Sequence, residues 1–233
     1  MYMIKLSHPI SELEAILNSY FIEQRFQIVN TRDIDSIHGN FDVLNVHSMF
    51  DARAYNDIFF INDTQILKKH NTGFEYKSLK QYGTPLRLAF LGRSYRKIKE
   101  TKKYDAVTFQ YEGVIADNDI SFVKGKKMID GIMSRLLPNI KTQTVSKFFP
   151  YAEPGYMVQI PCSLCGGVGC DECLDTGYVN GCAYGMLHRQ IVDSALGENN
   201  LVNVFSFCFN LSQIACAKYN INDIHQILLK EED

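Results

Sequence analysis

The sequence lacks tryptophan, has only 6 prolines among its 233 residues, and contains no cysteine before position 162. It also has no apolar run near the ~18 residues that a membrane-spanning helix needs. The first fifteen residues contain no charged region followed by an apolar stretch, which argues against a secretory signal. We therefore expect a cytoplasmic protein that makes no contact with membranes.

An excess of positive charge is also missing. Lys and Arg number 24 and Asp and Glu number 26, so the formal net charge of −2 excludes a uniformly basic coat for nucleic acid. Apolar residues are plentiful, at 46% of the chain with 13 Tyr and 15 Phe, which excludes a disordered or fibrous chain. Since no internal repeat, low-complexity stretch or linker is visible, we expect residues 1–233 to form a single domain.

The spacing of apolar residues predicts an α+β fold, a mostly antiparallel sheet with helices on it. A helix is expected at 11–24, opened by a capping box that pairs Ser11 with Glu14. Gly92 is expected to end a buried strand that starts at Leu86. The remaining elements are strands at 26–29, 107–115, 145–154, 157–161 and 202–209, helices at 122–137 and 211–218, and a strand followed by a helix within 66–80.

The cysteines are clustered, because four of the seven fall within twelve positions: Cys162, Cys165, Cys170 and Cys173. An odd, clustered set in a chain without a secretory signal indicates a metal site rather than a disulfide framework. The CxxC-x4-CxxC pattern within the Cys/Gly segment 162–181 lets tight turns aim all four thiolates at one ion. We predict a structural zinc site, since four thiolates leave no open coordination position. The alternative is a glycine-rich loop of reduced thiols without metal.

Several short motifs follow one another along the chain: FDVLN and DARAYNDIFF, ILKKHNTG, GRSYR, FQYEG, FFPYAEPGYMV, CSLCGGVGCDECLDTGY, GCAYGMLH, and VFSFCFNLSQIACAKYNINDIH. In this order, over about residues 30–227, they resemble the C-terminal half of bacterial phenylalanyl-tRNA synthetase alpha subunits. The resemblance implies the class II aminoacyl-tRNA synthetase fold, an antiparallel sheet flanked by helices, here with a Cys-rich knuckle inserted. It also implies an activity that joins phenylalanine to ATP and then transfers it to tRNA.

The resemblance further implies a pocket for the amino acid. His70 and Thr72 match a His-x-Ser motif that lies beside the substrate. Gln110 and Glu112 match the pair that holds the substrate's ammonium group, for which Glu112 supplies a charge-assisted acceptor. Without the resemblance, His70 is more often a structural histidine, and an alternating FQYEG is often only a half-exposed strand.

The same resemblance assigns the ring and phosphate ends of the pocket. Phe149 and Tyr151 match aromatic residues that edge the substrate's ring, although FFPY is often core in other proteins. Ser206 stands where the family has a small apolar residue at the foot of the ring pocket, so that it narrows the pocket or adds a hydroxyl. Arg96 matches the arginine that steadies the α-phosphate in the transition state.

The sequence departs from the family mainly on the nucleotide side. Cys208 and Asn210 stand where the family's third motif has two glycines, and Gln213 replaces the arginine that stacks on adenine. In the second motif, Ile98 replaces an acidic residue and Tyr104 replaces a histidine. We therefore expect that ATP and Mg²⁺ no longer support adenylation here, while the amino-acid side is mostly kept.

These observations leave three hypotheses for the function. The first is an alpha-like paralogue that binds an aromatic amino acid or a related amine without adenylating it, as a sensor, scaffold or regulatory partner. The second is an active ATP-dependent class II ligase that works with a beta-like partner. The third is an RNA-binding module built from the knuckle and the basic residues of 93–103.

Pairing with another chain is also expected. Class II domains of this kind dimerise through their first motif, which here corresponds to the helix at 11–24 and the strand after it. The partner is a second copy of this chain or a beta-like subunit. The N-terminal arm that the family uses on tRNA has no counterpart in this sequence, which argues against tRNA as a ligand.

Overall fold

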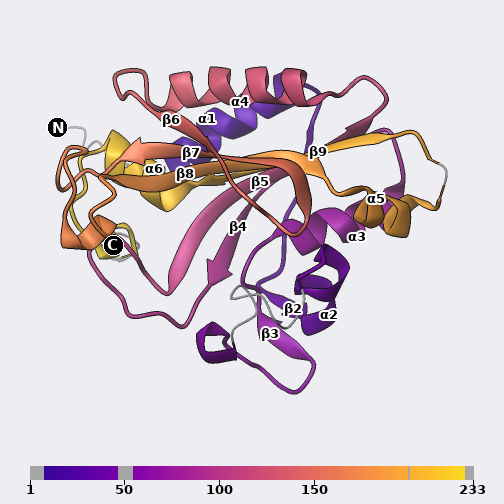
Figure 1. The fold of residues 1–233 in the computed structure, drawn as a ribbon, viewed down its shortest axis with the longest axis horizontal. Helices are drawn as coiled ribbons and strands as arrows, with labels where there is room; N and C mark the ends of the chain where they lie inside the picture. The colour runs from indigo at the N-terminus through magenta and orange to yellow at the C-terminus, as the bar shows by residue number, and fades with distance from the viewer. Residues whose placement is uncertain (1–7, 47–54, 199, 229–233) are drawn as a thin grey trace, which may run out of the picture.

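The computed structural model describes residues 8–46, 55–198 and 200–228. One seven-stranded sheet carries the fold, in the order β1-β4-β5-β9-β8-β7-β6 (Figure 1). Strand β1 pairs with β4 in parallel, and all other neighbours in this sheet are antiparallel, so the predicted sheet is confirmed with one parallel edge strand. The strands are β1 Gln27–Ile28, β4 Leu86–Tyr95, β5 Val107–Asp117, β6 Gln143–Ser146, β7 Ala152–Pro161, β8 Tyr178–Leu187 and β9 Asn203–Asn210.

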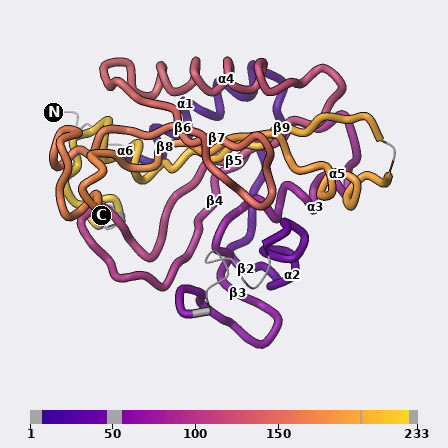
Figure 2. Tube along the Cα trace, viewed as in Figure 1, coloured from indigo at the N-terminus to yellow at the C-terminus, as the bar shows by residue number. Residues whose placement is uncertain are grey.

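The main core lies between one face of the sheet and three helices, α1 Pro9–Glu23, α4 Phe122–Leu136 and α6 Leu211–Lys218. Figures 1 and 2, drawn from the same direction, show α1 and α4 on the same side of the sheet, and residues of both helices pack in this core. Alternate residues of β5 and β9 point to this face, so that Phe21 of α1 stacks on Tyr111 at 5.6 Å and on Phe207 at 5.0 Å. The intervening residues of the same strands therefore point to the opposite face.

That opposite face carries a second core, in which Leu79 of helix α3 and Val192 of helix α5 pack on Leu88 and Val114 of the sheet. Helix α3 spans Thr72–Tyr82 and α5 spans Arg189–Leu196. A small two-stranded antiparallel sheet, β2 Ile34–Ser36 with β3 Gln65–Leu67, lies next to α3 in Figure 1 together with α2 Ile37–Asn40. The short elements η1 Asp42–Leu44, η3 Tyr55–Asp57, η4 Asp171–Cys173 and α7 His225–Leu228 complete the described chain.

The structure corrects several predicted boundaries. Helix α1 begins at Pro9 rather than Ser11, because the His8 side chain accepts a hydrogen bond from the Ile10 N–H at 3.3 Å and caps the helix. The predicted strand at 145–154 is wrong: β6 ends at Ser146, and β7 begins only at Ala152. Strand β8 and helix α5 were not predicted. For β8, the glycines and the cysteine of 178–187 obscure the alternation that is typical of a strand.

Two further outcomes concern the predicted segments. None of the helices in the described ranges is long and apolar enough to cross a membrane. The motif DARAYNDIFF begins at residue 51, and its residues 51–54 lie outside the described part of the chain.

Candidate functional site

A cavity of about 150 Å³ lies between the sheet and the first residue of α3, Thr72, on the face of the sheet that α3 covers. The side chains of β5 and β9 that point away from the main core form its floor. A second cavity of about 20 Å³ adjoins the first and shares several of its walls. The eight predicted site residues are brought together here: His70, Thr72, Arg96, Gln110, Glu112, Phe149 and Tyr151 line the larger cavity, and Ser206 lines the smaller one.

Glu112 and Gln110 of β5 form a pair of hydrogen-bond acceptors that Asn71 and Thr72, at the start of α3, hold in position. The Glu112 carboxylate accepts from the Asn71 backbone N–H at 3.3 Å and from the Thr72 hydroxyl at 3.4 Å. The Asn71 side chain donates to Gln110 Oε1 at 3.1 Å. Burial raises the pKa of Glu112, while the hydrogen bonds from Asn71 oppose that rise. The arrangement suits a bound ammonium group, which needs acceptors that are already in place.

Asn71 was not predicted as a site residue, and it depends on Gly92 in the neighbouring strand. Gly92 does not end β4, which continues to Tyr95. A Cβ atom added at Gly92 would lie 2.3 Å from Oδ1 of Asn71, whose side chain is buried. Gly92 therefore leaves room for the amide that orients Gln110, and the prediction that it ends the strand is wrong.

Replacing Gly92 with alanine is expected to lower the free energy of unfolding by about 1 kcal/mol, because the new methyl group displaces Asn71 from a packed site. Chemical denaturation of the two proteins measures the difference. The matched control is Gly131→Ala in α4, where nothing lies within 4 Å of the added Cβ and helix propensity gains up to about 1 kcal/mol. If Gly92→Ala left the free energy of unfolding unchanged, the close packing of Asn71 against Gly92 would not require a glycine, and the role given to Gly92 would be wrong.

His70 is held between two aromatic rings at the edge of the cavity. Its ring meets Phe41 edge-on at 5.9 Å and stacks on Tyr151 at 6.1 Å. Both ring nitrogens are buried and have no hydrogen-bond partner within the described residues. Burial, followed by the positive charges of Arg96 and Lys69, lowers the pKa of His70 to about 3. The imidazole is thus neutral near pH 7 and available to a ligand as both donor and acceptor.

The loop between β4 and β5 is pinned near the place where the resemblance puts the nucleotide. Lys103 is only 1% exposed, and its ammonium contacts the Ser163 hydroxyl of the Cys/Gly segment. The Gln213 side chain, 3% exposed, donates its Nε2 to the Lys103 backbone carbonyl. Asn210 caps α6 by accepting from the Gln213 N–H at 3.2 Å. Gln213, which replaces the arginine of the family's third motif, therefore holds this loop in place, and Asn210 caps the helix that carries Gln213.

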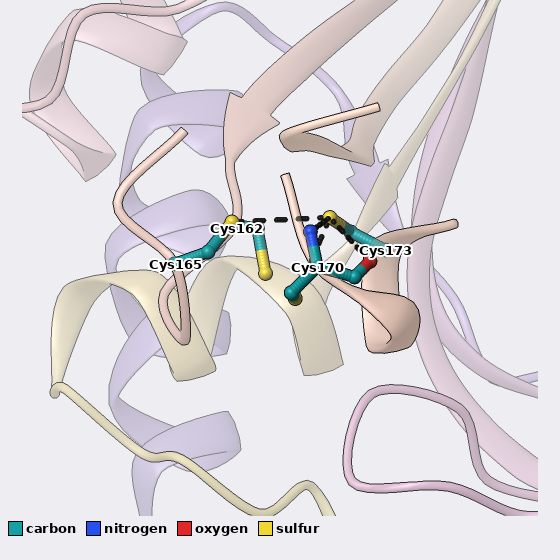
Figure 3. Close-up of side chains that lie close together, drawn as sticks. All are labelled: Cys162, Cys165, Cys170 and Cys173. Atoms are coloured by element: carbon teal, nitrogen blue, oxygen red, sulfur yellow. Dashed lines mark hydrogen bonds between the residues drawn. The ribbon is translucent and has the colours of Figure 1, made fainter. Parts of the chain in front are cut away.

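The four clustered cysteines converge in the turn between β7 and β8 (Figure 3). Their sulfur atoms all lie within 4.8 Å of one another, with Cys173 3.8 Å from Cys165 and 3.6 Å from Cys170. Zn–S bonds of about 2.3 Å in a tetrahedron give S–S edges of about 3.8 Å, so this group of thiols could hold a zinc ion. A hydrogen bond from the Gly169 backbone N–H lowers the pKa of Cys165 to about 7.

The fold and these motifs are those of a class II tRNA synthetase core domain. Residues 2–232 match the family described as tRNA synthetases class II core domain (F), and the chain belongs to that family. In structure it is similar to pyrrolysyl-tRNA synthetase from Desulfitobacterium hafniense, with a TM-score of 0.69 at 13% sequence identity over 98% of this chain and 76% of that one. The predicted class II fold is confirmed.

Within that class, the chain is similar to phenylalanine–tRNA ligase alpha subunits. It is 27% identical over 218 residues to that of Francisella tularensis subsp. tularensis (strain WY96-3418), and 26% identical over 218 residues to that of Francisella philomiragia subsp. philomiragia. The matches cover 93% of this chain but 64% of each relative, so the chain spans less than two thirds of their length. The predicted resemblance is thus confirmed.

Proposed function

We propose that this protein binds an aromatic amino acid, or a related amine, in the 150 Å³ cavity without adenylating it. It would then act as a sensor, scaffold or regulatory partner in the cytoplasm. The observation that carries the proposal is the contrast between the two sides of the site. The acceptors Gln110 and Glu112 are buried and oriented for an ammonium group, whereas the third-motif residues are engaged with the protein itself.

The nucleotide side supports the absence of adenylation in physical terms. A guanidinium provides a fixed charge and a planar surface on which adenine stacks, and Gln213 provides neither. Its amide is already donated to the Lys103 carbonyl, so ATP would have to compete with the pinned loop. The side chains of Cys208 and Asn210 also line the cavity at positions where the family has glycine. ATP and Mg²⁺ are therefore not cofactors under this proposal.

The cysteine cluster is proposed to hold structural zinc rather than to react. With four thiolates as ligands, the metal would have no open position, and its contribution would be to fix the turn between β7 and β8. The same turn positions Ser163, whose hydroxyl contacts the ammonium group of the buried Lys103. The metal would thus stabilise the loop between β4 and β5 indirectly, through the contact between Ser163 and Lys103.

A partner chain is proposed at α1, as either a second copy or a beta-like subunit. The support for this partner is that α1 corresponds to the first motif of the family; Ile16 and Ile22 on this helix are 38% and 60% exposed. A tRNA ligand is not needed for the proposed function.

A specific observation keeps active ligation as the second candidate: Arg96 lines the same cavity as Glu112, where it could meet an α-phosphate. Amino-acid-dependent ATP–pyrophosphate exchange and calorimetry on the purified chain separate the two functions. We expect calorimetry without ATP to detect an aromatic amino acid, and exchange to stay at background. Glu112→Gln should weaken binding at least about tenfold, since it removes a charge-assisted acceptor.

Two results would contradict the proposal, each in a different way. Exchange that is stimulated by an aromatic amino acid and lost in Arg96→Ala would establish the ligase instead. Absence of binding to both phenylalanine and tyrosine would show that the cavity does not serve these ligands. RNA binding that weakens steeply with salt and depends on Lys99 and Lys102 would favour the nucleic-acid alternative. Lys103, the third lysine expected to contact RNA, is 1% exposed and contacts Ser163, so it is not accessible to such a ligand.

A further inference from the structure

A second carboxyl group lies buried behind the cavity, and the proposed function does not use it. Glu75, in the first turn of α3, is fully buried, and neither carboxylate oxygen has a hydrogen-bond partner within the described ranges. It follows Thr72 by three residues, so both lie on the same side of the helix. Burial and then the charge of Glu112 raise its pKa well above the usual value, and the Ser206 hydroxyl acts in the opposite direction. Such a group needs an explanation, because an unsatisfied buried carboxyl destabilises the fold.

Ser206 connects this carboxyl group to the smaller cavity. It faces Val114 of β5 and Gly185 of β8 across the sheet, and it lines the 20 Å³ space. The other walls include Ala152, Ala183 and Gly185, which have little or no side chain and contribute no polar side-chain atom. Burial, followed by the charges of Cys208, Glu112 and Glu75, raises the pKa of Tyr151, which forms another wall of this space. The small cavity thus has the Ser206 hydroxyl in its wall, and the buried Glu75 carboxyl group lies close enough to Ser206 for that side chain to affect its pKa.

The sizes of the two cavities suggest how one ligand would occupy both. An apolar cavity of about 150 Å³ is large enough for a benzene ring, and about 10–15 Å³ suffices for one water molecule. The larger cavity has about this volume but is lined by both polar and apolar side chains, so the ring of the amino acid would lie against Phe149 and Tyr151 while its ammonium group meets Gln110 and Glu112. The 20 Å³ cavity accommodates a single further polar atom. Both cavities share Thr72, Phe149 and Tyr151, so a ring in one can extend a substituent into the other.

We propose that Ser206 and Glu75 select an amino acid whose ring ends in a hydroxyl group, a phenol such as that of tyrosine, over phenylalanine. The phenol O–H donates to Ser206 Oγ, and the Ser206 O–H donates to the Glu75 carboxyl group. The inference rests on the proposed function, since it requires that an aromatic amino acid occupies the cavity. A site built around a ligand hydroxyl discriminates strongly against the analogue that lacks it, because its own polar groups are then left unpaired.

A ligand series on the unmodified chain tests this selection without any risk of misfolding. Calorimetry is carried out with tyrosine, phenylalanine and 4-fluorophenylalanine. We expect tyrosine to bind at least about tenfold more tightly than phenylalanine, since the loss of one hydrogen bond with a buried partner costs at least that factor. The fluorinated ring occupies the small cavity but cannot donate, so it should bind no better than phenylalanine.

A pair of serine variants then assigns the selection to its residue. Ser206→Ala is expected to bring the ratio of the two affinities to about one by weakening tyrosine binding alone. Ser78→Ala is the matched control, because Ser78 is also buried, donates to the Phe74 carbonyl at 2.8 Å, and lines neither of the two cavities. It should leave the ratio unchanged.

The outcomes separate this inference from the proposed function. Phenylalanine binding as tightly as tyrosine, or a tyrosine preference that survives in Ser206→Ala, would overturn the inference and leave amino-acid binding intact. Tighter binding of lysine than of tyrosine would also overturn it, by showing that Glu75 receives a second ammonium group. Failure of every aromatic amino acid to bind would remove the proposed function itself and the inference with it.

Discussion

If the cysteine cluster holds zinc as proposed, substituting Cys173 with serine is expected to release the ion and to lower the free energy of unfolding by at least about 3 kcal/mol, because binding to a structural zinc site contributes directly to folding. Cys162 and Cys173 are 0% and 2% exposed, and both belong to the main core. Loss of the ion would leave the remaining thiols clustered within 4.8 Å without the bond that holds them. The effect should therefore exceed that of removing one buried sulfur atom.

The measurement combines metal content by elemental mass spectrometry with chemical denaturation. Cys216→Ala is the matched control, since Cys216 is 1% exposed in the same core but lies outside the cluster. It should keep one equivalent of zinc while losing only packing energy. A wild-type chain that carries no metal and is equally stable with and without a chelator would contradict the zinc site and leave the glycine-rich loop of reduced thiols.

The cysteine cluster is linked to the loop between β4 and β5 through a short series of contacts. Ser163 lies between two of the cysteines and meets the Lys103 ammonium, and the Lys103 carbonyl accepts from Gln213. The Lys102 carbonyl next to it accepts from the Ile224 N–H at 2.9 Å. Removal of zinc should therefore make the loop between β4 and β5 open more often, as well as the Cys/Gly segment 162–181. Faster amide hydrogen exchange at residues 97–105 would detect this opening.

The sequence predicted most strongly those features in which chemistry and spacing agree. The CxxC pairs predicted the convergence of four thiols, because two-residue spacers and glycines constrain where the sulfur atoms can lie. The alternation of FQYEG predicted that Gln110 and Glu112 share a face of a strand, which β5 has. These features depend on local geometry that a short segment determines by itself.

Features that depend on contacts between distant segments could not be predicted in the same way. Gly92 was interpreted as the end of a strand, since nothing in its neighbourhood announces that Asn71 lies against it. Glu75 has no signal in the sequence beyond its position three residues after Thr72, which matters only once that helix face is known to be buried. The pinning of the loop by Gln213 likewise joins residues 110 positions apart.

Replacing Glu75 with glutamine is expected to stabilise the protein at pH 8 by on the order of 2 kcal/mol and by much less at pH 5, because the folded wild-type chain must keep a proton on the buried carboxyl group at pH 8, whereas glutamine carries no titrating proton. The pKa of Glu75 is raised well above 4.5 in the folded state, whereas the unfolded chain releases this proton near pH 4.5. Above that pH the folded state binds more protons than the unfolded state, so wild-type stability falls as the pH rises until the folded-state pKa is reached. Glutamine holds no such proton, and the difference between the two proteins should therefore grow from pH 4.5 upwards.

Denaturation curves at several pH values measure this difference, and the comparison of two proteins removes other contributions. His70, with its pKa lowered to about 3, gives the opposite slope below pH 6.5, but it is present in both chains. Glu23→Gln on the exposed side of α1 serves as the control and should change stability little at any pH. A Glu75→Gln variant that is less stable than the wild type at pH 8 would show that the carboxylate is ionised and paired in the folded protein. Glu75 would then carry no cost from an unsatisfied, uncharged carboxyl group. A hydroxyl group of the ligand would no longer be needed to explain why this carboxyl group is buried behind the ring pocket.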